Sequence, residues 1–177
     1  MRRLMVIAVP VAIAALLAGC SSSSPKAAPK PPGLGKGVVH QAHVGASLDL
    51  TTKTGRQFSV TLSTITDPAQ GAGSAHPSTM TRFVAVNLTI DNTSGQSINP
   101  AAVRDTIAVG SGGQVYADSN VKLADCTVFA RGHVNIGAGS SATGCVAFEI
   151  PTAVTITEVQ FLPTAGTAGN YGEWLNP

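Results

Sequence analysis

Apolar side chains recur at every second position in several short stretches of the chain, and this pattern constrains the fold more than any other feature. The clearest stretches are FSVTL from Phe58 and VAVNLTI from Val84. A period of two with many Val, Ile and Thr residues is typical of strands that bury one face. The same pattern predicts further strands at residues 107–109, 146–150 and 156–161, and around Val115.

Turn-forming residues separate these stretches. Gly, Asn, Asp, Ser and Thr cluster in the breaks, for example at residues 91–95 and 111–113, where they favour turns. No window of eleven or more residues after Cys20 carries a helical stripe. Seven to nine short strands within roughly 120 residues predict an all-β, immunoglobulin-like antiparallel β-sandwich. A chain of 177 residues has room for one such domain, which we place at residues 44–163.

The first twenty residues resemble the signal of a bacterial lipoprotein. Arg2 and Arg3 precede sixteen uncharged, mostly apolar residues, which end in Leu-Ala-Gly before Cys20. A positive start, a short apolar stretch and small residues at the cleavage point are typical of an export signal. Sixteen residues are short for a membrane span, which needs about 20. We predict a lipoprotein signal peptide over residues 1–19 and a lipid on Cys20, with an ordinary signal peptide or a simple membrane anchor as the alternative.

Residues 20–43 are expected to form a tether, because Ser, Pro and Gly dominate most of its length. Removal of Arg2 and Arg3 lowers the number of Lys and Arg residues from 11 to 9, which equals the number of Asp and Glu residues. The mature chain therefore has a net charge near zero and no basic run in its body. Nucleic-acid binding depends on clustered Lys and Arg, so we do not expect it.

One predicted loop is much longer than its neighbours. Residues 67–79 (DPAQGAGSAHPST) would connect two strands, whereas hairpin loops usually have about two to five residues. Long loops either carry function or are merely mobile, and both interpretations stay open. As a binding loop it would offer Asp67, His76 and the adjacent Met80. Residues 164–177 form a Gly-rich tail whose Trp174 is expected to pack against the edge of the domain.

Cys126 and Cys145 remain once Cys20 carries the lipid, and an even pair in an exported domain favours a disulfide. The bond would close a loop of about twenty residues and contribute roughly 3 kcal/mol to stability. A copper site is the competing interpretation, and it needs a thiolate, two histidines and usually a methionine. No histidine follows Cys145 and Met80 is the only methionine after the signal peptide, so we expect no metal and no cofactor.

Other chemistry-bearing residues do not assemble into a recognisable motif. His40 and His43 form an His-x-x-His pair without a third ligand nearby. His76 with Ser74 or Ser78 is the starting point of a hydrolase hypothesis, but the chain has no G-x-S-x-G motif and no carboxylate obviously placed to orient the imidazole. We therefore expect a protein that is not an enzyme.

Three stretches resemble a known family of exported bacterial domains. They are FVAVNLTIDNTSGQSINP from Phe83, the strand–Gly–Tyr hairpin that ends at Tyr116, and GSSATGCVAFEIP from Gly139. The chain is similar here to the lipoprotein domain of unknown function in the immunoprotective extracellular antigen superfamily, over about residues 44–163. The resemblance implies an immunoglobulin-like fold, and a cysteine pair that corresponds to Cys126 and Cys145. It implies no catalytic residues.

These inferences together predict a lipid-anchored protein on the outer face of the cell membrane that acts by binding. It would contact the membrane through the lipid on Cys20 and present the 67–79 loop or a sheet edge to an envelope protein, a glycan or a lipid. The alternative is an apolar-ligand carrier or an accessory of envelope assembly. Strands rich in Ala and Val would then leave a cavity between the two sheets.

Overall fold

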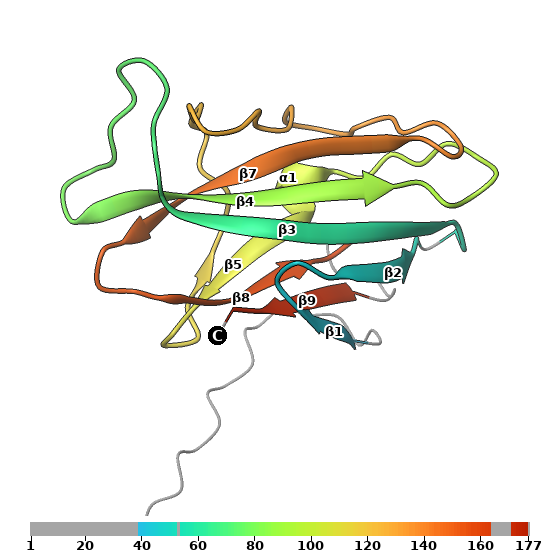
Figure 1. Cartoon of the computed structure of the whole chain (residues 1–177), viewed down its shortest axis with the longest axis horizontal. Coiled ribbons are helices and arrows are strands. Elements are labelled where there is room, and N and C mark those ends of the chain that lie inside the picture. Colours follow the sequence, from blue (N-terminus) through green and yellow to red (C-terminus); the bar gives the residue numbers. More distant parts are fainter. Residues whose placement is uncertain (1–38, 53, 164–170, 177) are drawn as a thin grey trace, which may run out of the picture.

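The chain folds into two stacked β-sheets (Figure 1). The structure is a computed structural model that describes residues 39–52, 54–163 and 171–176. Within these residues no helix is long and apolar enough to cross a membrane. The elements are β1 (Val39–His43), β2 (Ser47–Thr51), β3 (Gln57–Ala69), β4 (Thr81–Asp91), α1 (Ala102–Asp105), β5 (Thr106–Gly110), β6 (Val115–Tyr116), β7 (Ser141–Pro151), β8 (Ile156–Phe161) and β9 (Tyr171–Leu175).

The two sheets confirm the predicted β-sandwich. One sheet has the strand order β1-β9-β8-β5-β6 and the other has the order β2-β3-β4-β7. Neighbouring strands are antiparallel except β1 and β9, which pair in parallel from Val39 opposite Tyr171 to His43 opposite Leu175. The sandwich is therefore not wholly antiparallel, because the strands at the two ends of the domain meet side by side and run in the same direction.

The core lies between the sheets. The side chains that point inward from each strand, at every second position, fill it. Phe58 of β3 and Phe161 of β8 pack edge to face, with ring centroids 6.2 Å apart. Trp174 of β9 is fully buried, and its indole Nε1 donates a hydrogen bond to the Ala46 carbonyl at 2.8 Å. The fully buried side chains also include Leu50, Leu62, Leu88, Ile90, Ile98, Phe148, Ile150 and Ile156.

The sandwich is larger than the predicted range of 44–163. Strand β1 lies in the part of the sequence that we assigned to the tether, and β9 lies in the predicted tail. The sequence VHQAH of β1 has too few apolar residues to show a period-two pattern. Burial of Tyr171 and Trp174 explains why the chain end joins the sheet. The predicted lipid site on Cys20 lies outside the described residues.

The outer face of the β2-β3-β4-β7 sheet is divided into two halves. Outward residues at one end of β4 are Phe83 and Ala85, which are buried. Those at the other end are polar, and they continue across the sheet as a row of hydroxyls in register: Ser47, Thr61, Thr89 and Thr143. The apolar half is covered by other parts of the chain, and that cover forms the candidate site.

We predict that Trp174→Ala lowers the free energy of unfolding by about 3–5 kcal/mol, because it leaves a cavity where β9 meets the core. The exposed edge residue Val115 provides the control, and Val115→Ala should cost less than about 0.5 kcal/mol. Urea unfolding followed by circular dichroism measures both variants. Equal stability of the two variants would mean that β9 does not complete the core.

Candidate functional site

Two segments cover the apolar half of the outer sheet face. They are the 70–80 loop between β3 and β4, and residues 117–131, which we call the strap (Figure 1). Leu123 of the strap is buried in a second apolar cluster on this face, together with Ala69, Phe83, Ala85, Cys145 and Ala147. Burial of these side chains favours the covered arrangement, since apolar area removed from water contributes roughly 25 cal/mol per Å².

A disulfide between Cys126 and Cys145 fastens the strap to β7. This is the pairing that the sequence predicted. The backbone continues the attachment, because the Cys145 N–H donates to the Thr127 carbonyl and the Phe129 N–H donates to the Cys145 carbonyl, both at 2.9 Å. Gly144 permits this approach, since a Cβ at that position would lie 3.0 Å from the Thr127 carbonyl oxygen.

The 70–80 loop is bonded to the strap along its first part. The Ala72 N–H donates to the Lys122 carbonyl at 2.9 Å, and the Ala124 N–H donates to the Gln70 carbonyl at 2.8 Å. The Gln70 N–H also donates to the Asp125 carboxylate at 2.6 Å. The loop and the strap therefore form one hydrogen-bonded unit, which the disulfide joins to the sheet.

Glu149 of β7 holds the far end of the loop. Its carboxylate accepts hydrogen bonds from the Thr81 hydroxyl at 2.6 Å and from the Ser78 N–H at 2.7 Å. These bonds favour the charged carboxylate and lower the pKa of Glu149 below its ordinary value of 4.5, with the Thr81 hydroxyl as the largest cause. The loop is thus fixed at both ends, which favours a defined shape over the mobile interpretation.

The predicted 67–79 loop is too long at its first end. Asp67 belongs to β3, which continues to Ala69 through a register shift. An ion pair between the Asp67 carboxylate and the Arg82 guanidinium, with 2.5 Å between Oδ1 and Nε, joins β3 to β4 at this point. The hydrogen bond and the charge of Asp67 raise the pKa of Arg82. Asp67 therefore makes a structural contact between β3 and β4.

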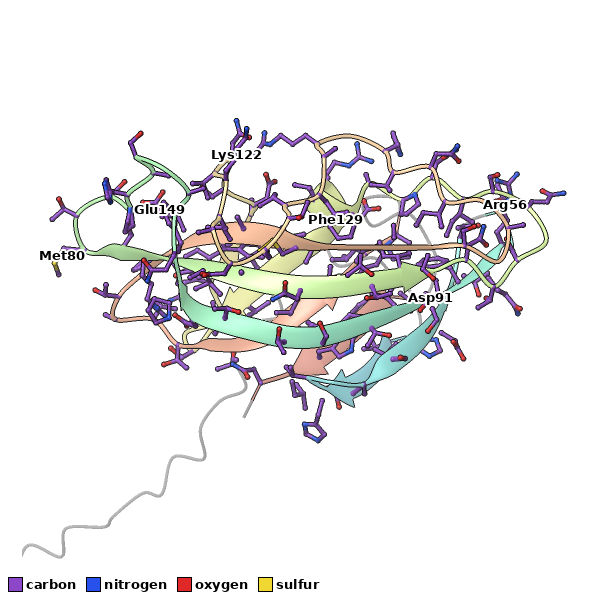
Figure 2. All side chains as sticks on the ribbon, turned by 45° about the horizontal axis from the view of Figure 1, so that its top comes forward. Arg56, Met80, Asp91, Lys122, Phe129 and Glu149 are labelled. Carbon is purple, nitrogen blue, oxygen red and sulfur yellow. A yellow bond between two sulfur atoms is a disulfide. The ribbon has the colours of Figure 1, made fainter. Side chains whose placement is uncertain are left out.

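The other two predicted contact residues, His76 and Met80, are exposed. Met80 leaves 75% of its surface accessible and has a left-handed backbone with φ of 66°, which is uncommon for a residue with a side chain. Its carbonyl accepts a hydrogen bond from the Thr152 N–H at 2.9 Å. Figure 2 places Met80 at one extreme of the molecule, beyond Glu149.

The His-x-x-His pair also separates in the structure. His40 and His43 lie on strand β1, where residues at odd spacing point to opposite faces. His40 lines a hollow of about 390 Å³ beside Asp49, whereas His43 is exposed. In the described part of the chain, no group of three or more His, Cys, Asp or Glu residues is placed to hold a metal ion.

Glu149 and Glu158 do not meet across neighbouring strands. Glu149 lies on β7 of the four-stranded sheet, and Glu158 lies on β8 of the other sheet, opposite Leu175. The connection between the two strands changes sheets. The sequence shows two adjacent alternating stretches but not this change of layer.

A groove of about 470 Å³ opens between the two arms of the strap. One wall is formed by residues 118–122 and the other by residues 128–131, with Ala147 of β7 and Val103 of α1 between them. An ion pair between Asp118 and Arg131 joins the two walls. Lys122 and Phe129 lie on the same side of the molecule (Figure 2).

The strap and its groove have no periodic signal in the sequence. Residues 117–140 have neither a period-two pattern nor a helical stripe, so they read only as a connection. The available signal was Cys126, because a disulfide to Cys145 requires this connection to return to the neighbouring strand. The groove itself forms where the strap ends its backbone pairing with β7, after Phe129. No sequence pattern indicates that point.

Comparisons with known proteins show similarity in fold. No family model and no curated protein matches the sequence. The solved structure of MPT63, a secreted protein from Mycobacterium tuberculosis, is 19% identical, with a TM-score of 0.53 over 77% of this chain and 97% of that chain. A candidate lipoprotein from Bacillus subtilis, ycdA, is 13% identical, with a TM-score of 0.53 over 76% of this chain and 39% of that chain.

We predict that replacing both cysteines by Ala lowers the free energy of unfolding by roughly 3 kcal/mol, the value expected for a loop of this length. Reduction of the unaltered protein should have a similar effect. Urea unfolding under oxidising and reducing conditions measures the difference. A stability that does not respond to reductant would show that the disulfide is not formed or does not constrain the strap.

We predict that the Ser78 amide reports the titration of Glu149. A carboxylate whose pKa is lowered in the folded state stabilises its contacts above the ordinary pKa and loses them as the pH falls through the folded pKa. The Ser78 amide resonance should therefore shift with a midpoint below 4.5, as measured by NMR titration. In the variant Glu149→Gln this transition should disappear, and a midpoint at or above 4.5 in the unaltered protein would contradict the contact.

Proposed function

We propose that the chain is an exported lipoprotein whose sandwich is a non-enzymatic binding module of the bacterial envelope. The lipid on Cys20 holds it on the outer face of the cell membrane, and the tether gives the domain reach. The observation that carries the binding role is the unit made by the strap and the 70–80 loop, which has a groove of about 470 Å³. Binding residues occur preferentially on loops that a rigid scaffold positions.

The construction of this unit supports a binding role. Hydrogen bonds from Ala72 and Ala124 and the disulfide at Cys126 give two long connections one fixed shape. A surface that is ordered before it meets a partner loses less conformational entropy on binding. The exposed side chains of His76 and Met80 extend the same surface beyond the strap. An envelope protein, a glycan or a lipid is the proposed partner class.

The proposed location is supported by the N-terminal sequence and agrees with the comparisons. Arg2, Arg3 and the apolar stretch before Cys20 form the expected export signal. One of the similar structures is a secreted protein and another is a candidate lipoprotein. Both names are compatible with a domain that works outside the cytoplasm.

The carrier of an apolar ligand is the second candidate, and the groove is the observation that favours it. A cavity between the sheets is a poor candidate, because Trp174, Phe148 and Phe161 fill that space. The groove lies instead at the edge of β7, and its volume is within the range of about 300–1,000 Å³ that small-molecule sites occupy. An accessory role in envelope assembly would use the same surface.

Photo-crosslinking on intact cells tests the proposed binding module. A probe at Met80 samples the loop, a probe at Ala130 samples the strap, and a probe at Thr61 samples the open polar half of the sheet. We expect a discrete adduct from Met80 or Ala130, little from Thr61, and loss of the adduct in a Cys20→Ala form. Adducts of equal yield at all three positions, or none at any, would contradict a site on the strap and loop.

A pair of glycine variants refines this experiment. A Cβ at Gly71 would lie 2.1 Å from the Ala75 carbonyl oxygen, so Gly71→Ala must reshape the loop. A Cβ at Gly95 meets no atom within 4 Å, so Gly95→Ala is the matched control. We expect Gly71→Ala to reduce the Met80 adduct several-fold and Gly95→Ala to leave it unchanged.

A further inference from the structure

The groove in the strap has an apolar interior. Phe129 and Ala147 are buried, and Phe129 leaves 8% of its surface accessible. The remaining apolar lining consists of Val103, Val121, Val128 and Ala130. Side chains of this kind, in a hollow of about 470 Å³, favour the apolar body of a small molecule over a strongly hydrated one.

The charged residues that line the groove have a net positive charge, whereas the rest of the domain has a net negative charge. Five of the 11 Lys and Arg residues precede residue 39, whereas all nine Asp and Glu residues follow it, so the domain has six basic and nine acidic residues. Two of those six cations, Lys122 and Arg131, nevertheless line the groove, with Asp118 as its one acid. The cationic rim therefore departs from the acidic balance of the domain.

Lys122 is the cation that remains for a ligand. The Asp118 carboxylate is already paired with Arg131 across the mouth of the groove. No acidic side chain in the described part of the chain forms an ion pair with Lys122, and only its backbone carbonyl is occupied, by the Ala72 N–H. Its ammonium group is therefore free to meet an anion at the rim of the groove.

We propose that the groove binds a single amphiphilic molecule with an apolar body and an anionic end group. The body lies over Phe129 and Ala147, and the carboxylate, phosphate or sulfonate pairs with Lys122 at the rim. This inference rests on the proposed binding function and names the ligand class of the same site. The carrier site would then lie at the edge of β7 and not in the space between the sheets.

Two fluorescent probes with the same ring system test this proposal. One is 1-anilinonaphthalene-8-sulfonate, which has an anionic end, and the other is N-phenyl-1-naphthylamine, which has none. Each is titrated into the full mature chain as the Cys20→Ala form, so that the protein's own acyl groups do not compete. We expect one molecule of the sulfonate to bind per chain, about fivefold tighter than the neutral probe, because a partly exposed ion pair supplies roughly 1 kcal/mol.

Two pairs of variants locate the site. Lys122→Gln should weaken the sulfonate about fivefold and leave the neutral probe unchanged, whereas Arg56→Gln, the same charge change at the opposite end of the molecule (Figure 2), should affect neither. Ala130→Phe fills the groove and should remove both probes, whereas Ala138→Phe, at another exposed alanine, should not. Circular dichroism checks that each variant is folded, and Ala130→Leu replaces Ala130→Phe if that variant is not.

The outcomes separate this proposal from the function on which it rests. Equal affinity for both probes, or no effect of Lys122→Gln, overturns the anionic end group. Binding that survives Ala130→Phe, or no binding of either probe, overturns the groove as the site. In each case a discrete cellular adduct at Met80 or Ala130 would still support the proposed binding module. The absence of that adduct would contradict both the binding module and the proposed ligand class.

Discussion

The apolar half of one outer sheet face is the constraint on which the rest of the candidate site depends. Phe83, Ala85 and Ala147 point away from the core between the sheets, and water would meet them if nothing else did. Two long connections cover these side chains: the 70–80 loop, which leads into β4, and the strap, which precedes β7. The strap supplies Leu123 as the covering side chain, and the disulfide at Cys145 keeps it there. Once the strap lies on this face, its two arms and the edge of β7 enclose the groove.

Charge and hydrogen bonding then fix the shape of the cover. The strap and the 70–80 loop bond to each other through backbone groups, so each supports the position of the other. Glu149 binds the far end of the loop, and the Asp67–Arg82 ion pair joins the two strands that the loop connects. Such contacts are individually modest, because a typical hydrogen bond contributes about 1 kcal/mol net. Their effect here is to join two loops, a disulfide and two strands into one unit, which is the property that a preformed binding surface needs.

The sequence predicted the parts of the fold that follow from periodicity. It did not predict the elements whose position depends on tertiary contacts. Strands β3, β4 and β7 alternate because their inward faces are apolar and fill the core, and Cys126 with Cys145 indicated the bond between distant segments. Strand β1 has no such pattern and joins the sheet by pairing with β9. Asp67 looked like a loop residue because it begins a stretch rich in Gly, Ala and Pro, yet it lies in β3 and pairs with Arg82. The groove was not predictable, since its walls come from segments without regular structure.

Hydrogen exchange on the oxidised and the reduced protein tests most directly whether the cover is one unit. The amides of Ala72, Ala124 and Phe129 bond to Lys122, Gln70 and Cys145 respectively, so each reports a different joint of the cover. We predict that reduction of the disulfide lowers the protection of all three amides together, to a level below that of core amides such as Val86, whose protection falls only with the global stability. Unchanged protection at Ala72 after reduction would contradict it, because the loop would then be held without the strap.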